Sequence, residues 1–280
     1  MKRTCLQKDT SSVKQNSCEF HQAELSFKER IFDLKDNLHV KIFLQMKKSI
    51  LFFILLGVFT IAGCNLFDDE GGGVKKPKGE SGTFTDVRDG NVYKTIKIGD
   101  QTWMAENLAY LPEVYPPDEG SEKDGYYSHS FYYVYDFLSS DVELAKETEN
   151  YKKYGVLYNW NAALTACPAG WHLPSDAEWD ILDAELGDYK QSILKANSGW
   201  HNDGNGTNST GFSALPAGSR DYYQGTFYNI TSGAFWWSSD DDKDYEFMAW
   251  YRDLTYSDVS NLGRAEFYKS NGFSVRCIKD

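Results

Sequence analysis

Residues 167–179 have the sequence CPAGWHLPSDAEW, and this stretch marks where the best-defined helix of the chain begins. Ser175 and Glu178 have the spacing of a capping box, in which each side chain satisfies a free backbone N–H group of the other. Apolar residues then recur on one helical face, at Trp179, Leu182 and Leu186. Gly187 is the residue type that ends a helix in a left-handed conformation. We therefore predict a helix that begins after Ser175 and ends at Gly187.

The segments before this helix indicate strands as well as helices. Alternating apolar and polar residues predict a hairpin, with a strand over 92–98, a turn at Gly99-Asp100 and a return strand over 101–104. Residues 154–167 favour a strand that continues into a short helix over Trp160–Ala166.

The remaining segments carry weaker signals. Residues 111–153 are rich in Pro and Tyr, and we expect a long loop with one short helix near 141–149. A further helix is expected over 189–196. Short strands are expected in the last third of the chain, near Phe212–Leu215, Ala234–Ser238, Phe247–Tyr251 and Phe273–Cys277.

An apolar segment precedes this part of the chain. Residues 46–63 have the sequence MKKSILFFILLGVFTIAG, in which two lysines, an apolar run and two small residues follow one another. This is the three-part layout of a secretory signal. The apolar run of about 12 residues is shorter than the roughly 18–20 residues of a helix that spans a bilayer. The alternative of a buried core helix would require an amphipathic period, which the run lacks.

Ile61-Ala62-Gly63-Cys64 resembles the bacterial lipobox. The resemblance implies that the Cys64 thiol carries a diacylglycerol, that cleavage occurs before it and that the new amine is acylated. Two or more acyl chains anchor a protein stably, whereas one binds only marginally. Asn65 stands where an inner-membrane retention Asp would stand, so the resemblance favours the outer membrane or cell surface.

These signals divide the chain into four parts. Residues 1–45 precede the signal, and the simplest account is that they are a spurious extension before a true start at Met46; the alternative is a cytoplasmic segment before a membrane anchor. Residues 46–63 are the predicted lipoprotein signal peptide. Residues 64–83 are rich in Gly, Lys, Asp and Glu, and we interpret them as a lipidated flexible tether. The folded domain is then expected over 84–280.

The composition limits the class of partner. Hydrophobic residues make up 41% and charged residues 25% of the 280 residues, which is ordinary for a globular protein. The net charge of −12 argues against nucleic-acid binding, which requires a basic surface. Aromatic residues make up 16%, and many are Tyr and Trp, which suit half-exposed surfaces of strands.

Export would leave two cysteines in the mature domain, Cys167 and Cys277. Unmodified thiols in an oxidising compartment usually pair, so we predict a disulfide between them. The alternative is a redox-active or metal-binding pair. Neither a Cys-x-x-Cys spacing nor clustered histidines support that alternative.

Four stretches carry a family resemblance. They are YKTIKIG with QTWMAENL at 93–108, the stretch from Tyr154 to Trp160, the stretch 167–179, and GFSVRC at 272–277. In this order and spacing they resemble the Fibrobacter succinogenes major paralogous domain, over about residues 84–280. Members are typically secreted or lipoprotein domains of uncharacterised function, so the resemblance implies location and fold more than chemistry.

The stretch from Trp171 to Trp179 also resembles the signature of formylglycine-generating enzymes, and GFSVR resembles their closing strand. That resemblance implies an α+β fold of the C-type-lectin-like or sulfatase-modifying-factor-like type, with short twisted strands, few helices and long loops. It does not transfer the activity. The oxidase would need a reactive cysteine pair near the C-terminus for copper, and only Cys277 stands there. We therefore expect no enzyme, with Trp171 and Trp179 in the core, His172 as a hydrogen-bonding loop residue and Glu178 as a helix cap.

Aromatic pairs suggest a ligand surface. Trp237 of the pair Trp236-Trp237, Tyr222 of the pair Tyr222-Tyr223, and His201 are the candidate ligand-binding residues, because flat aromatic rings stack on the apolar face of a sugar. Adjacent residues of a strand point to opposite faces, so one member of each pair is expected in the core.

The stretch from His201 to Asn208 alternates oxygen-bearing side chains with glycines, as calcium loops do. Asp203, Asn205 and Asn208 are the candidate calcium ligands. We expect no other cofactor. The loop lacks the EF-hand pattern, and an ordinary Asn-Gly turn loop is the alternative.

Three hypotheses for function follow. The first is a cell-envelope lipoprotein, bound to the membrane by its lipid, whose non-catalytic surface domain binds a glycan or a protein. The second is a structural or adhesive envelope protein without a small ligand. The third is an enzyme related to formylglycine-generating oxidases.

Overall fold

The computed structural model describes residues 80–120, 129–187, 190–257 and 262–280. The predicted signal peptide and Cys64 therefore lie outside the described residues, as does most of the predicted tether. None of the described helices is both long enough and apolar enough to cross a bilayer.

The described residues contain helices and short antiparallel strands. The strands are β1 Ser81–Thr85, β2 Val92–Ile98, β3 Gln101–Met104, β4 Tyr132–Tyr133, β5 Leu157–Tyr158, β6 Trp171–His172, β7 Ala217–Arg220, β8 Phe227–Ile230, β9 Gly233–Asp241, β10 Met248–Thr255, β11 Gly263–Tyr268 and β12 Ile278–Lys279. The helices are α2 Val142–Glu147, α3 Glu149–Tyr154, α4 Trp160–Ala166, α5 Asp176–Glu185 and α6 Lys190–Leu194.

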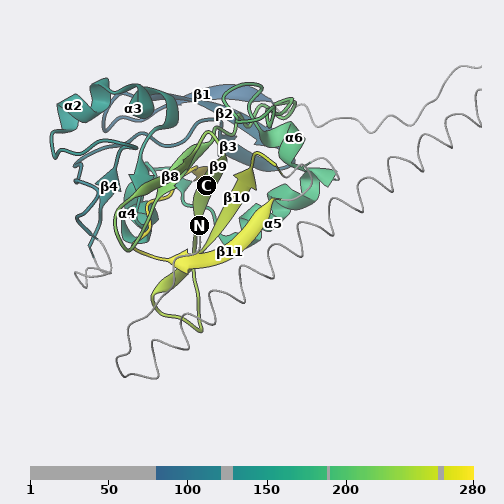
Figure 1. The fold of residues 1–280 in the computed structure, drawn as a ribbon. Helices are drawn as coiled ribbons and strands as arrows, with labels where there is room; N and C mark the ends of the chain where they lie inside the picture. The colour runs from purple at the N-terminus through teal and green to yellow at the C-terminus, as the bar shows by residue number, and fades with distance from the viewer. Residues whose placement is uncertain (1–79, 121–128, 188–189, 258–261) are drawn as a thin grey trace, which may run out of the picture. The chain divides into compact units, whose positions relative to one another are not determined.

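The largest sheet joins the two ends of the domain. Its strand order is β1-β2-β3-β12-β6, so β3, the third strand of the domain, pairs with its last strand, β12. β1, β2 and β3 lie next to one another in Figure 1. The hairpin of β2 and β3 has the predicted register, with Ile98 opposite Gln101 across the turn. Gly99 in that turn has φ +58°, a conformation that residues other than glycine seldom adopt. The mixture of helices with several antiparallel sheets confirms the α+β class.

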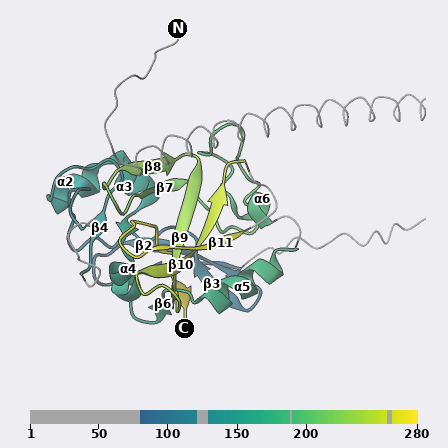
Figure 2. The same cartoon turned by 60° about the horizontal axis from the view of Figure 1, so that its bottom comes forward.

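β9 is the central strand of the core. It pairs with β10, which pairs with β11, and both α4 and α5 pack against β9. Trp236 packs with Trp179 of α5, whereas Trp237 belongs to the core cluster that contains the alanines of α4. The two helices therefore lie on opposite sides of β9 (Figures 1 and 2). Because both faces of β9 are covered, neither tryptophan reaches the surface.

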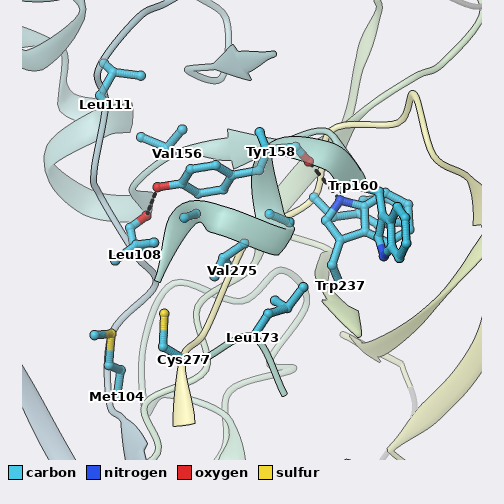
Figure 3. Packing of buried hydrophobic residues seen from close by; sticks show 14 of the residues in the cluster. Met104, Leu108, Leu111, Val156, Tyr158, Trp160, Leu173, Trp237, Val275 and Cys277 are labelled. Atoms are coloured by element: carbon cyan, nitrogen blue, oxygen red, sulfur yellow. Dashed lines mark hydrogen bonds between the residues drawn. The ribbon is translucent and has the colours of Figure 1, made fainter. Parts of the chain in front are cut away.

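The α4 side of the core is held by hydrogen bonds as well as by apolar packing. Tyr158 donates its hydroxyl to the Leu108 carbonyl oxygen at 3.3 Å and to the Tyr110 carbonyl oxygen at 2.8 Å. Trp237 donates its indole N–H to the Tyr158 carbonyl oxygen at 2.8 Å (Figure 3). A buried polar atom without a partner would cost about 1–3 kcal/mol, so these bonds allow large aromatic residues to be buried.

The disulfide between Cys167 and Cys277 is present, which confirms the predicted pairing. It joins the end of α4 to the segment before β12, across 110 residues of sequence. Cys277 is fully buried beside Met104 and Leu173 in the α4-side core (Figure 3).

Helix α5 has the predicted capping box. The Ser175 hydroxyl accepts from the Glu178 N–H, and the Glu178 carboxylate accepts from the Ser175 N–H at 2.7 Å. Trp179 and Leu182 are buried, and Gly187 has φ +62° just after the helix. The helix predicted at 160–166 is α4, and the one predicted at 189–196 is the shorter α6.

A buried arginine lies between the aromatic residues on the α5 side of the core. The Arg276 guanidinium lies 4.2 Å from the Phe212 ring centroid and 5.5 Å from that of Trp236. It donates to the Phe212 carbonyl oxygen, and to the Asn107 amide oxygen at 3.0 Å. Asn107 also accepts the Trp236 indole N–H at 2.9 Å. Burial removes the hydration of the guanidinium and lowers the pKa of Arg276 to about 9.

Some sequence predictions of the elements were wrong. The tether was expected to extend to residue 83, but β1 begins at Ser81, because its backbone pairs with β2 while its side chains stay mostly exposed. Residues 212–215 form only an isolated bridge between Lys195 and Ala214. The strand expected over 273–277 is also replaced by isolated bridges, and the true strand, β12, follows it.

Candidate functional site

Trp237 does not contribute to a ligand surface, and its assignment as a ligand-binding residue was wrong. Its side chain is 0% exposed and packs against Phe273, with ring centroids 4.5 Å apart. We had expected one member of each adjacent aromatic pair to remain outside. The physical reason for the error is that α4 and α5 cover opposite faces of β9, so both tryptophans are buried.

The two other candidate residues lie at opposite ends of β10. The ring of His201 lies 5.6 Å from that of Tyr256, just after the strand, and Tyr222 lies beside Tyr268, which pairs with Met248 at the start of the strand. β10 has eight residues, which correspond to about 26 Å at roughly 3.3 Å per residue. Tyr222 and His201 therefore do not share one site, and only Tyr222 is considered further.

The candidate calcium residues act as turn-forming residues. The Asn205 amide oxygen accepts the Trp200 N–H at 2.9 Å, and the Asn208 amide oxygen accepts the Ser213 N–H at 2.8 Å. Asp203 and Asn208 have positive φ values, which Asn and Asp tolerate better than most residues. These contacts favour the turn-loop alternative. Among the described residues, no group of three or more His, Cys, Asp or Glu side chains is arranged to hold a metal ion.

His172 forms hydrogen bonds, as the sequence suggested, but it belongs to strand β6 and not to a loop. Its Nε2 lies 2.8 Å from the Glu178 carboxylate and its Nδ1 lies 2.6 Å from the Asp280 carboxylate. Burial acts to lower the pKa of His172, but the bonds to the two carboxylates outweigh it and raise that pKa. Because Glu178 caps α5, this group links the start of the helix to the end of the chain.

A different feature has the properties of a ligand site. It is a hollow of about 700 Å³ beside the turn between β9 and β10. We call it the Phe247 hollow, and its lining residues are Ser130, Asn161, Leu164, Thr165, Glu246, Phe247 and Lys269. Small-molecule sites typically have volumes of about 300–1,000 Å³ and combine apolar walls with a few polar groups. The hollow meets both criteria.

The turn that carries Phe247 is built by Asp242. Its carboxylate accepts the N–H groups of Asp244 at 2.7 Å and Tyr245 at 3.2 Å, which closes the chain into a turn. The backbone of Asp242 then pairs with Met248 at 3.0 Å. These bonds hold the apolar Phe247 at the surface, where its side chain is 37% exposed.

Lys269 lines the hollow and packs against Trp160. The Lys269 ammonium donates to the Glu246 carbonyl oxygen at 2.7 Å and lies 4.5 Å from the Trp160 ring centroid. Lys269 is only 9% exposed, and its ammonium nitrogen lies 3.5 Å from a carboxylate oxygen of Asp241. The positive charge is therefore balanced inside the protein, and the stem of Lys269 supports the turn.

Helix α4 forms the opposite wall. Asn159 caps this helix, since its amide oxygen accepts the Ala162 N–H at 3.1 Å. The same oxygen accepts the Phe131 N–H at 2.9 Å, which attaches the segment of Ser130 to the helix. Leu164, on the exposed side of α4, is 41% exposed and gives the hollow its second apolar surface.

A line of aromatic rings extends from the hollow across the surface. We call it the aromatic row, and its members in spatial order are Tyr245, Phe247, Tyr268, Tyr222 and Tyr223. Successive ring centroids are 6.0, 5.4, 3.9 and 6.2 Å apart. The two ends are the most exposed, with Tyr245 at 53% and Tyr223 at 48%.

The middle of the row is held by a polar anchor. The rings of Tyr222 and Tyr268 are stacked within 9° of parallel. The Asn271 amide oxygen accepts the Tyr222 N–H at 2.7 Å, and the Asn271 N–H donates to the Tyr268 carbonyl oxygen at 2.9 Å. One buried asparagine therefore fixes both backbones, so that the stacked pair is positioned before any ligand arrives.

The sequence interpretation found one residue of this site and missed the rest. Tyr222 was identified from its neighbouring tyrosine, whereas Phe247 was expected only as part of a strand. The acidic sequence from Asp240 to Asp244 indicates a solvated loop, but Tyr245 and Phe247 alternate with Glu246 as in a strand, so nothing in the sequence marks Phe247 as a turn residue. Lys269 and Leu164 carry no sequence signal of their own, because their role depends on tertiary contact.

Comparison with known proteins assigns the domain but no ligand. A family model described as the Fibrobacter succinogenes major domain matches residues 96–279. Neither a curated protein nor a solved structure gives a significant match. The matched residues include every residue that lines the Phe247 hollow.

Proposed function

This chain belongs to the Fibrobacter succinogenes major domain family, and we propose that its domain binds glycans at the bacterial cell envelope through the Phe247 hollow and the aromatic row. The single observation that carries the proposal is the joining of the two: Phe247 is at once a wall of the hollow and a member of the row. A sugar in the hollow could stack on Phe247 while its neighbours in the chain lie along the tyrosines.

The chemistry of the lining supports a sugar rather than a purely apolar ligand. Phe247 and Leu164 offer apolar contact for the C–H face of a pyranose ring. Ser130, Asn161 and Thr165 offer hydroxyl and amide groups, which can donate to and accept from sugar hydroxyls. Exposed aromatic side chains with polar neighbours are typical of surfaces that bind ligands or partners.

The lining also supports binding without catalysis. Among the described residues, the lining contains no histidine and no cysteine, and Glu246 is its one exposed carboxylate. Glycoside hydrolysis normally uses a pair of carboxylates across the scissile bond. We propose a C-type-lectin-like arrangement for this domain, a fold type in which loops beside short strands form the binding surface.

Lipid anchoring completes the proposal. The lipobox-like sequence before Cys64 supports attachment of the domain to a membrane, and the disulfide supports an oxidising location. Labelling of cells with palmitate tests this part. Incorporation into the wild type and its loss in Cys64→Ser are expected, and a wild-type chain without label would contradict it.

A glycan array with the purified mature domain tests the binding itself. The expected result is retention of at least one oligosaccharide class, with affinity at least tenfold weaker in Phe247→Ala. Tyr228→Ala is the matched control, because Tyr228 is also an exposed aromatic residue but lies on β8, outside the row. Repeating the array with calcium and with a chelator tests the cation separately. Absence of binding in both conditions, or equal losses in the two variants, would contradict the proposal.

A further inference from the structure

The charged side chains around the Phe247 hollow differ in whether a ligand can bind them. The cation of Lys269 is buried and already occupied by the Glu246 carbonyl oxygen, the Trp160 ring and the Asp241 carboxylate. Releasing it toward an anionic ligand would leave these three groups without their partner. Lys269 is therefore a support of the hollow and is not free to serve as an anion-binding residue.

The available charges are negative. The side chain of Glu246 is exposed and lines the hollow. Asp244 belongs to the same turn and lines an adjoining hollow together with further carboxylates. At the other end of the row, the Asp221 carboxylate accepts the N–H groups of Tyr223 and Gln224. A ligand along the row would meet carboxylates at both ends.

A carboxylate can bind a neutral sugar well. It accepts hydrogen bonds from two hydroxyl groups, and such charge-assisted bonds are roughly twice as strong as neutral ones. The same carboxylate repels a uronic acid or a sulfated sugar, because like charges a few ångströms apart repel each other, most strongly at low salt.

From these positions we infer that the Phe247 hollow selects uncharged glycans and excludes acidic ones, with Glu246 as the specificity-determining residue. This inference rests on the proposed function and narrows its ligand class. Glu246 accepts hydrogen bonds from hydroxyl groups of the bound sugar, and Phe247 stacks on the apolar face of that sugar. Lys269 holds in place the turn that carries Glu246 and Phe247.

The test compares sugars that differ only in charge. Cellohexaose and mannohexaose are titrated into the mature domain at low salt, alongside the same hexaoses oxidised to carboxylates at C6. A neutral hexaose is expected to bind at least tenfold more tightly than its oxidised form. In Glu246→Gln, this ratio should fall at least fivefold, while the melting temperature stays within 2 °C of the wild type because Glu246 is exposed. A fivefold fall in the ratio corresponds to about 1 kcal/mol, the upper end of what one exposed charge contributes.

Glu266→Gln is the matched control, since Glu266 is an exposed carboxylate on β11 that lines only the adjoining hollow. Its ratio should stay within twofold of the wild type. Equal binding of the neutral and oxidised hexaoses, with both still weakened by Phe247→Ala, overturns the charge selection and leaves the proposed function standing. An unchanged ratio in Glu246→Gln overturns the role of Glu246. Failure of all the hexaoses to bind overturns the inference and, if the glycan array is also empty, the proposed function.

Discussion

The backbone N–H of Lys269 donates to the carbonyl oxygen of Phe247 at 2.9 Å. This one bond fixes the first residue after β11 to the last residue of the turn before β10. The Lys269 side chain donates a hydrogen bond to the Glu246 carbonyl oxygen and lies over the ring of Trp160. The aromatic wall of the hollow is therefore held by a residue that is almost hidden from solvent.

Replacement of Lys269 tests this support. Lys269→Ala should lower the free energy of unfolding by about 1–3 kcal/mol, because it removes the partner of the Glu246 carbonyl oxygen and of the Trp160 ring. Amide hydrogen exchange over 243–247 should increase more than exchange in α5. An exchange pattern that changes equally in both regions would show that Lys269 does not act on the turn.

Arg276 is expected to be the most sensitive charged residue of the core. Arg276→Ala should lower the free energy of unfolding by about 3 kcal/mol or more, since it removes the partner of the Phe212 carbonyl oxygen and leaves a cavity beside Trp236. Arg264→Ala is the matched control, because Arg264 is exposed and bound to Asp176, and it should cost less than about 1 kcal/mol. Chemical denaturation measures both values, and similar losses in the two variants would contradict this account of the core.

The disulfide should contribute strongly to stability. Replacing both Cys167 and Cys277 with alanine should cost about 2–5 kcal/mol, because the bond closes a loop of 110 residues and restricts the unfolded chain. The wild type in a strong reductant should approach the stability of the double variant. If the reductant has no effect while free thiols are detected, the bond does not contribute in this way.

The pH dependence of stability should reveal the group around His172. The raised pKa of His172 means that its contribution is complete below the ordinary histidine value of 6.5 and is lost as the pH rises through the folded-state pKa. For Glu178, burial acts to raise the pKa, but the bonds from Ser175 and His172 outweigh it and lower that pKa. Its contribution is therefore complete above the ordinary value of 4.5 and is lost as the pH falls through the folded-state pKa.

The two contributions overlap fully between pH 4.5 and 6.5. In that window His172→Asn should melt several degrees below the wild type, and the difference should shrink toward pH 9. Melting curves from pH 4 to 9 provide the measurement. A difference that is constant over this range would show that His172 contributes by packing and not by charge.

Local sequence signals predicted the elements that begin or end at a capping residue or a turn-forming glycine. The capping box at Ser175 and the turn at Gly99-Asp100 fix backbone geometry over a few residues, so α5 and the first hairpin were predicted correctly. β11 was missed although Arg264 to Phe267 alternate polar and apolar residues. β1 was missed because backbone pairing stabilises it while its side chains stay mostly exposed. No apolar periodicity marks such a strand.

The candidate site was harder to predict than the fold, for a physical reason. Exposure of an aromatic residue depends on what covers its strand, and the sequence around Trp237 does not show that α4 and α5 cover both faces of β9. Phe247 and Lys269 are separated by 22 residues and meet only through the pairing of β10 with β11. Tyr222 was identified from an adjacent tyrosine, whereas its stacking partner Tyr268, which also has an aromatic neighbour in Phe267, was missed.

Chemical-shift mapping with a bound oligosaccharide tests the central claim most directly. The mature domain, labelled at Leu methyl groups and aromatic rings, is titrated with the hexaose that binds most tightly. The account predicts that the largest shifts occur at Leu164, Phe247 and Tyr222, with little change at His201 or Tyr256. Saturable shifts confined to the His201–Tyr256 end of β10, or to the acidic hollow around Trp250, would contradict it.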